Sequence, residues 1–131
     1  MSNKILKKIQ LKESIREKII LELFEIREMI NGSFHHLKVR CGKSHCKCMK
    51  TDDYRHPHQR IKWKINGKPI SRAVPKEDVS LIEEINGNFR KFKLLKRKLN
   101  KLETEIKELL DRYEKEVIAS TQKLRPYLVI Q

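Results

Sequence analysis

All three cysteines of this chain lie within eight residues, in the run from Cys41 to Cys48, which reads Cys-Gly-Lys-Ser-His-Cys-Lys-Cys. His56 and His58 follow within ten residues of the last cysteine. A loop with few apolar residues cannot hold its shape by packing, whereas a metal ion bound by thiolates and imidazole stabilises it directly. An odd number of cysteines at this spacing argues against a disulfide framework. The run therefore predicts a structural Zn²⁺ site.

Four ligands complete a tetrahedral zinc site, and the thiolates of Cys41, Cys46 and Cys48 supply three of them. His56 is the first candidate for the fourth ligand, because the proline after it stiffens the backbone. His58 is the reserve candidate. Two readings without zinc stay open, namely three ordinary reduced cysteines or an iron–sulfur cluster, although a cluster usually has four cysteine ligands.

Other nearby side chains rank lower as ligands. His45 is adjacent to a cysteine ligand, and neighbouring side chains tend to diverge. Asp52 and Asp53 offer hard oxygen ligands, which suit a site with three soft thiolates less well.

The positive charge of the chain is concentrated in its middle third. Residues 34–76 carry twelve Lys or Arg against two Asp, so they account for +10 of the net +14. Such a surface attracts an acidic partner, and nucleic acid is the partner that we expect. The candidate contact residues are Lys38, Arg40, Lys43, Lys47, Arg60, Lys62, Lys64, Lys68, Arg72, Arg90, Lys91, Lys93 and Arg97.

The patterning predicts a mainly α protein with a small β insertion. Apolar residues at helical spacing predict an N-terminal helix within 1–32, running from Lys4 to Ile30 and ending at Asn31-Gly32. Over residues 33–75 we expect a zinc-binding β head, with a short strand around Leu37–Cys41 and a hairpin that turns at Asn66-Gly67. In the hairpin, Lys62 and Lys64 share one face, and Ile61, Trp63 and Ile65 share the other.

A long helix that begins after Pro75 is expected over residues 76–119, and an irregular tail over residues 120–131. Apolar residues recur every three or four positions from Val79 to Val117, which is typical of a coiled-coil seam. Asn86-Gly87 interrupts the pattern without changing its phase. A weakened but continuous helix is therefore expected there, with a helix break as the alternative.

The two predicted helices leave the same small head, so we expect an antiparallel helical hairpin, a coiled coil, capped by the zinc-knuckle head. The second helix is the longer one, and its overhang from Ile106 to Val117 still has a seam to bury. A homodimer or a helix of another protein is the simplest partner for this overhang.

The motifs also resemble those of a family. Cys-Gly-Lys-x-x-Cys-x-Cys, then His56-Pro57, then a Gly-Lys hairpin and Val74-Pro75 before a long helix resemble a group of small bacterial and archaeal proteins. Their core reads Cys-Gly-Lys-x-x-Cys-x-Cys, His-Gly-Pro, a short β segment and an aromatic/Arg helix. The resemblance covers residues 38–100 and implies a zinc-knuckle-like core followed by a long helix. Here Pro57 stands where the family has Gly, and the spacing from Cys48 to His56 is longer.

Together these features favour a zinc-stabilised nucleic-acid-binding protein that contacts the backbone of a duplex through its basic head. A regulator or an accessory subunit of a mobile-element or defence system fits this size. The alternative is a coiled-coil assembly or adaptor protein that binds a protein partner or a ribonucleoprotein. No enzyme motif is present in the sequence, so we expect no catalytic residues. Without a long apolar run, we expect a cytoplasmic protein with no membrane contact.

Overall fold

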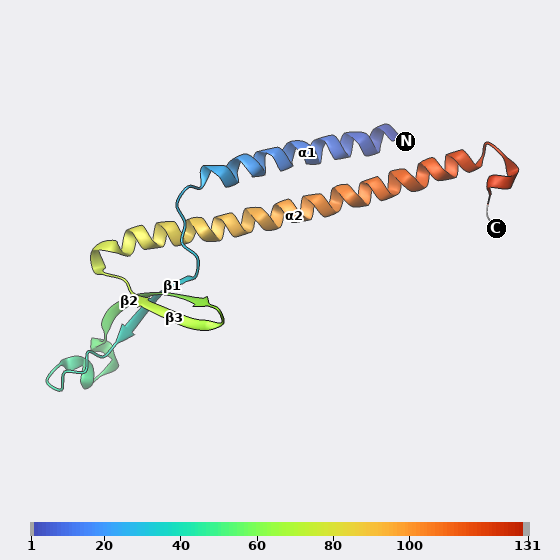
Figure 1. The fold of residues 1–131 in the computed structure, drawn as a ribbon. Coiled ribbons are helices and arrows are strands. Elements are labelled where there is room, and N and C mark those ends of the chain that lie inside the picture. The colour runs from blue at the N-terminus through green and yellow to red at the C-terminus, as the bar shows by residue number, and fades with distance from the viewer. Residues whose placement is uncertain (1, 130–131) are drawn as a thin grey trace. The chain divides into compact units, whose positions relative to one another are not determined.

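The computed structural model describes residues 2–129 and is mainly helical, with a small three-stranded antiparallel sheet and a long C-terminal helix (Figure 1). Its helices and strands are α1 (Ser2–Glu25), β1 (Ser33–Val39), β2 (His56–Ile65), β3 (Lys68–Ala73) and α2 (Val79–Gln122). Short 3₁₀ turns lie between β1 and β2, before α2 and after it. The chain divides into two compact units. The helical unit contains residues up to Glu25 and from Phe92 onward, and the head unit contains residues 26–91.

In the helical unit, α1 and the C-terminal part of α2 run antiparallel. Lys12 Nζ lies 2.6 Å from Glu105 Oε2, and Arg16 lies 3.4 Å from Glu103 Oε1. Residue numbers thus rise along α1 while those of the contacting residues on α2 fall, as expected for antiparallel helices. The buried apolar side chains of this unit are Ile5, Ile19, Leu23, Leu95 and Leu109. The coiled-coil seam stays a prediction.

Helix α1 ends at Glu25, five residues before the predicted end at Ile30. The residues that follow leave the helix because α2 binds their backbone instead. Ile30 N–H donates to the Ile85 carbonyl at 3.1 Å. Asn86 Nδ2 donates to the carbonyls of Ile30 and Gly32, at 3.2 and 3.0 Å. The prediction that Asn31-Gly32 caps this helix is therefore wrong, because Gly32 lies in the connection to β1.

The three strands pair in the order β1-β2-β3, and both pairs are antiparallel. The predicted hairpin is confirmed, since Asn66 and Gly67 turn between β2 and β3 with φ of 51° and 79°. Two consecutive positive φ values are what a type I′ turn requires. Strand β1 covers Ser33–Val39, so it starts earlier than predicted and leaves Cys41 in the following loop.

On β2, Ile61 is buried and Trp63 is half-buried, while Ile65 on the same face is 48% exposed. Lys62 and Lys64 lie on the opposite face and are both exposed. This alternation agrees with the predicted separation of apolar and basic side chains on the hairpin.

Helix α2 follows Pro75 and a single 3₁₀ turn, Lys76–Asp78. It continues through Asn86 and Gly87, so the predicted continuous helix is confirmed and the helix break is wrong. Its end at Gln122 lies three residues beyond the predicted 119. A further 3₁₀ turn, Pro126–Leu128, lies in the predicted irregular tail, of which residues 130 and 131 fall outside the described chain. Within residues 2–129, no helix combines the length and the apolar character needed to span a membrane.

Candidate metal centre

The loop between β1 and β2 carries the cysteines, and strand pairing brings its two ends together. Val39 at the end of β1 pairs with His56 at the start of β2. Cys41 leaves β1 two residues after that pair, so it lies near His56 although fifteen positions separate them in the chain. Antiparallel pairing therefore places one thiol and one imidazole on opposite sides of the loop entrance.

The other two thiols are brought together by a 3₁₀ turn, Lys47–Met49. Cys46 precedes this turn and its N–H donates to the Lys43 carbonyl at 3.0 Å, while its own carbonyl accepts from Met49 N–H at 3.1 Å. Cys48 lies inside the turn and is fully buried. The tight turn explains how a Cys-x-Cys spacing directs both sulfurs to one centre.

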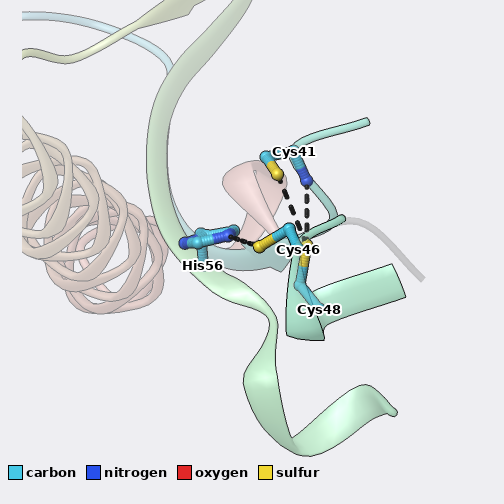
Figure 2. Close-up of side chains that lie close together, drawn as sticks. All are labelled: Cys41, Cys46, Cys48 and His56. Atoms are coloured by element: carbon cyan, nitrogen blue, oxygen red, sulfur yellow. Dashed lines mark hydrogen bonds between the residues drawn. The ribbon is translucent and has the colours of Figure 1, made fainter. Parts of the chain in front are cut away.

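The four side chains converge on a common point, as Figure 2 shows. The sulfurs of Cys41 and Cys48 are 3.5 Å apart, and the sulfur of Cys46 lies 3.3 Å from His56 Nε2. All four ligand atoms lie within 4.8 Å of one another. In a tetrahedral zinc site with Zn–S near 2.3 Å and Zn–N near 2.05 Å, ligand atoms are about 3.5–3.8 Å apart. The cluster therefore fits one metal ion of this size.

The three cysteines are free thiols. A sulfur–sulfur distance of 3.5 Å is far longer than the roughly 2.05 Å of a disulfide bond. Among the buried residues of the described chain, Cys48 is the one that belongs to this loop. Apolar packing therefore contributes little here, and a bound ion would tie Cys41, Cys46 and His56 to that buried sulfur.

Local hydrogen bonds prepare one thiol for metal binding. The Cys48 backbone N–H, followed by the His56 side chain, lowers the pKa of Cys46 to about 6. The Cys41 N–H acts on Cys48 in the same direction. Burial and the neighbouring thiols outweigh it and raise the pKa of Cys48. Cys46 is therefore largely a thiolate at neutral pH, and the thiolate is the form that binds zinc.

The alternative ligands lie outside this cluster. His58 Nε2 is 3.0 Å from an Arg60 guanidinium nitrogen, and the cluster includes neither His58 nor His45. Asp52 accepts from Arg40 at 2.8 Å and pairs with Arg55 at 3.0 Å. The side-chain bond from Arg40, helped by Arg55, lowers the pKa of the Asp52 carboxyl. Of the fourth-ligand candidates, the structure brings His56 to the sulfurs.

Beyond His56, alternate residues of β2 continue as a row of cationic and imidazole side chains on one face. His58, Arg60, Lys62 and Lys64 follow at every second position, which is a repeat of about 6.7 Å in a strand. Arg60 Nε donates to Ser71 Oγ on β3 at 2.6 Å, so its guanidinium is held across this face. We call these four residues the β2 row. The sequence did not predict the place of His58 in this row or Ser71 as the partner of Arg60. The spacing of every second residue along β2 was the signal that could have shown the place of His58 in the row.

Three other predicted contact residues lie on the opposite face of the sheet. Strand pairing places Arg72 beside Ile61, Lys68 beside Ile65 and Lys38 beside Pro57. Ile61 and Ile65 share the face that is opposite to Lys62 and Lys64. The basic residues of the sheet are thus divided between its two faces, with the β2 row on one of them.

The remaining predicted contact residues lie in the metal loop or on α2. In the loop, Arg40 is ion-paired with Asp52, the ammonium of Lys47 lies 5.4 Å from the centroid of the Tyr54 ring, and Lys43 is exposed. On α2, Arg90 and Lys91 belong to the head unit, whereas Lys93 and Arg97 belong to the helical unit. Arg90 and Lys91 therefore belong to the same unit as the β2 row, and Lys93 and Arg97 do not.

Comparison with known families gives a match that includes the whole metal loop. Residues 4–85 match a family described as a domain of unknown function, DUF6788. The chain belongs to this family. The matched residues include α1, the sheet and the start of α2, and most of α2 lies outside them. Comparisons with curated proteins and with solved structures found no match. Function must therefore be inferred from the site itself.

Proposed function

We propose that this protein is a zinc-stabilised nucleic-acid-binding protein whose β2 row contacts phosphate groups. The observation that carries the proposal is the arrangement of β2. Its first residue, His56, belongs to the metal cluster, and the alternate residues after it form the row on one face. A ligand with regularly spaced negative charges suits such a row, and the backbone of a nucleic acid has this pattern.

The proposed role of zinc is structural. Three thiolates and one imidazole supply all four positions of a tetrahedral ion, which is typical of closed, non-catalytic sites. When bound, the ion would supply a rigid tie between the end of β1, the loop and the first residue of β2. The soft sulfur donors favour zinc over magnesium or calcium. We therefore propose a binding protein without enzymatic activity.

The charge around the site supports an anionic partner. Within residues 34–76, the acids are Asp52 and Asp53, and Asp52 is engaged by Arg40 and Arg55. The exposed cations Lys62 and Lys64 have no acid within their strand. Aromatic side chains are scarce in the chain, at 6% of residues. Contacts to a backbone or duplex are therefore expected rather than recognition by base stacking.

One observation favours a second candidate, the coiled-coil assembly or adaptor protein. Lys38, Lys68 and Arg72 lie on the face opposite to the β2 row, so the head is basic on both sides. A general positive surface of this kind also suits an acidic protein or a ribonucleoprotein. The two candidates differ in what determines binding. In the first it is the position of each cation on the β2 row, and in the second it is only the total positive charge of the head.

Fluorescence anisotropy tests this difference with labelled duplex DNA, single-stranded DNA and duplex RNA of equal length, titrated from 50 to 300 mM salt. Lys62→Ala combined with Lys64→Ala removes two charges from the β2 row. The matched control, Lys38→Ala with Lys68→Ala, removes two charges from the opposite face. If the row contacts phosphates, the first pair weakens binding and lowers the salt slope by about 1.8 for duplex DNA, while the control pair leaves the slope unchanged.

Two results would count against the proposal. Absence of binding to all three nucleic acids at 50 mM salt would favour the assembly protein. An equal loss in both double variants would show that total charge, and not the row, determines binding. Metal removal by a chelator should weaken binding in the wild type, because β2 would lose the tie at its first residue.

A further inference from the structure

On one side of the helical unit, apolar side chains of both helices are exposed to solvent. On α2, Leu110 is 50% exposed, Tyr113 43% and Val117 44%, and on α1 Leu6 is 52% exposed. Leu6, Ile9, Leu110 and Tyr113 line a common hollow between the two helices. We call this set, together with Val117, the apolar flank. It lies entirely within the helical unit.

Helix α1 covers only part of the apolar stripe of α2. Leu109 is buried, whereas Leu110, the next residue around the helix, is half exposed. On α1, Ile5 is buried and Leu6 beside it is open. A contiguous open patch of this kind on a two-helix unit is typical of a surface that binds another chain.

The charge along α2 indicates which chain it binds. Residues 93–101 contain five Lys or Arg and no acid, and residues 103–116 contain six Asp or Glu against three Lys or Arg. A second copy of α2 lying antiparallel places the basic segment of each copy against the acidic segment of the other. We propose that the apolar flank binds a second copy of this chain in this antiparallel arrangement, so that two helical units form a symmetric dimer.

Helix geometry gives the register. Lys96 and Glu114 are separated by about five full turns, so they lie at the same angular position on α2. Leu110 lies one turn before Glu114 on the same side. An antiparallel pair centred on Glu105 sets Lys96 of one copy opposite Glu114 of the partner subunit, and twofold symmetry repeats this contact.

The opposite side of the helical unit is less suited to this role. The groove there is lined by eight residues, of which five are charged: Lys8, Lys12, Glu105, Glu108 and Arg112. The hollow of the apolar flank has no charged lining residue within the described chain, and Asn3 is its polar member. Burial of the flank itself therefore removes apolar surface from water, and the charged segments beside it meet groups of opposite sign.

Sedimentation equilibrium of the zinc-loaded full chain from 1 to 100 µM tests the interface. The wild type should reach twice the chain mass of 15.7 kDa. Leu110→Glu should remain a monomer at 100 µM. Leu94→Glu is the matched control, since Leu94 is 49% exposed on the same helix but projects from the other side, and it should dimerise like the wild type. Circular dichroism checks that both variants keep their helices.

A monomeric wild type at 100 µM would overturn the proposal, and so would equal dissociation of the Leu110 and Leu94 variants. The antiparallel register has its own test. Lys96→Glu and Glu114→Lys should each weaken the dimer about tenfold, because each sets like charges opposite one another twice. The double variant restores opposite charges and should return to within about twofold of the wild type. A double variant weaker than either single variant would refute this register.

Discussion

Replacement of Asn86 by alanine tests how the head unit is held together. Asn86 lies in the first part of α2 and is 1% exposed. Its side-chain amide donates to the carbonyls of Ile30 and Gly32, in the segment between α1 and β1. These two bonds, with the Ile30 N–H to Ile85 carbonyl bond, join that segment to α2. Asn86→Ala removes the two side-chain bonds and keeps the backbone bond from Ile30 to Ile85.

The expected loss follows from the two bonds. Each hydrogen bond contributes about 1 kcal/mol net, and the two carbonyls left without this donor raise the cost to about 2.5 kcal/mol. Alanine favours the helix over asparagine by about 0.5 kcal/mol, which offsets part of that loss. The Asn86 side-chain oxygen has no partner among the described residues, so no further hydrogen bond is lost with it. Asn86→Ala should therefore lower the free energy of unfolding of the head by about 2 kcal/mol.

Trp63 provides the assay, because it is the single tryptophan of the chain and lies on β2. Urea unfolding of zinc-saturated protein, followed by tryptophan fluorescence, should show a midpoint about 1.5 M lower for Asn86→Ala at an unchanged slope. The matched control is Asn88→Ala, because Asn88 makes one exposed bond to the Glu28 carbonyl at 3.0 Å. A midpoint for Asn86→Ala equal to that of the control would refute this reasoning.

Three further predictions concern the metal, a glycine and a carboxylate. Cys46→Ser should lower bound zinc from about one per chain to a small fraction, measured by elemental analysis, and leave the helical circular dichroism largely intact. Gly32→Ala should destabilise the head by more than the roughly 1 kcal/mol expected at Gly67, measured by urea unfolding. Both glycines have positive φ, but a Cβ at Gly32 would also strike the backbone of β2. Asp52→Asn should lower thermal stability at neutral pH, where the carboxylate accepts from Arg40. Because folding lowers the pKa of Asp52, this stabilisation is present above the ordinary pKa and is lost as pH falls through the lowered one. A difference that persists at pH 2 would contradict it.

Much of the architecture follows from short-range patterns. The Asn66-Gly67 turn is readable because two consecutive positive φ values favour these residues. Helix α2 begins soon after Pro75 and keeps its phase through Gly87, where one glycine costs too little to stop a helix of 44 residues. The alternation of Ile61 with Lys62 is likewise local, since strand geometry places neighbours on opposite faces.

The end of α1 could not be read in this way. Apolar residues keep a helical spacing to Ile30, yet the helix stops at Glu25. Hydrogen bonds from Asn86 and Asn88, more than fifty residues away, hold the backbone of this segment in a non-helical path. From the sequence, Asn86-Gly87 is expected to weaken α2, whereas in the structure Asn86 is a buried anchor for the head.

For the metal centre too, the sequence indicates one part of the site and the fold decides the other. Three cysteines within eight residues indicate a metal loop because nearby thiols can reach one ion without any knowledge of the fold. The sequence also ranks His56 first as the fourth ligand, because Pro57 follows it, and the structure brings His56 to the sulfurs. What places it there is the pairing of Val39 with His56, which brings the start of β2 to the exit of β1 and which the sequence does not show. His58, two positions along the strand, is not part of the cluster and contacts Arg60 instead. Backbone preferences and ligand spacing act over a few residues and can therefore be read from the sequence. Contacts between distant segments depend on which strands and helices meet, and that depends on the folded chain as a whole.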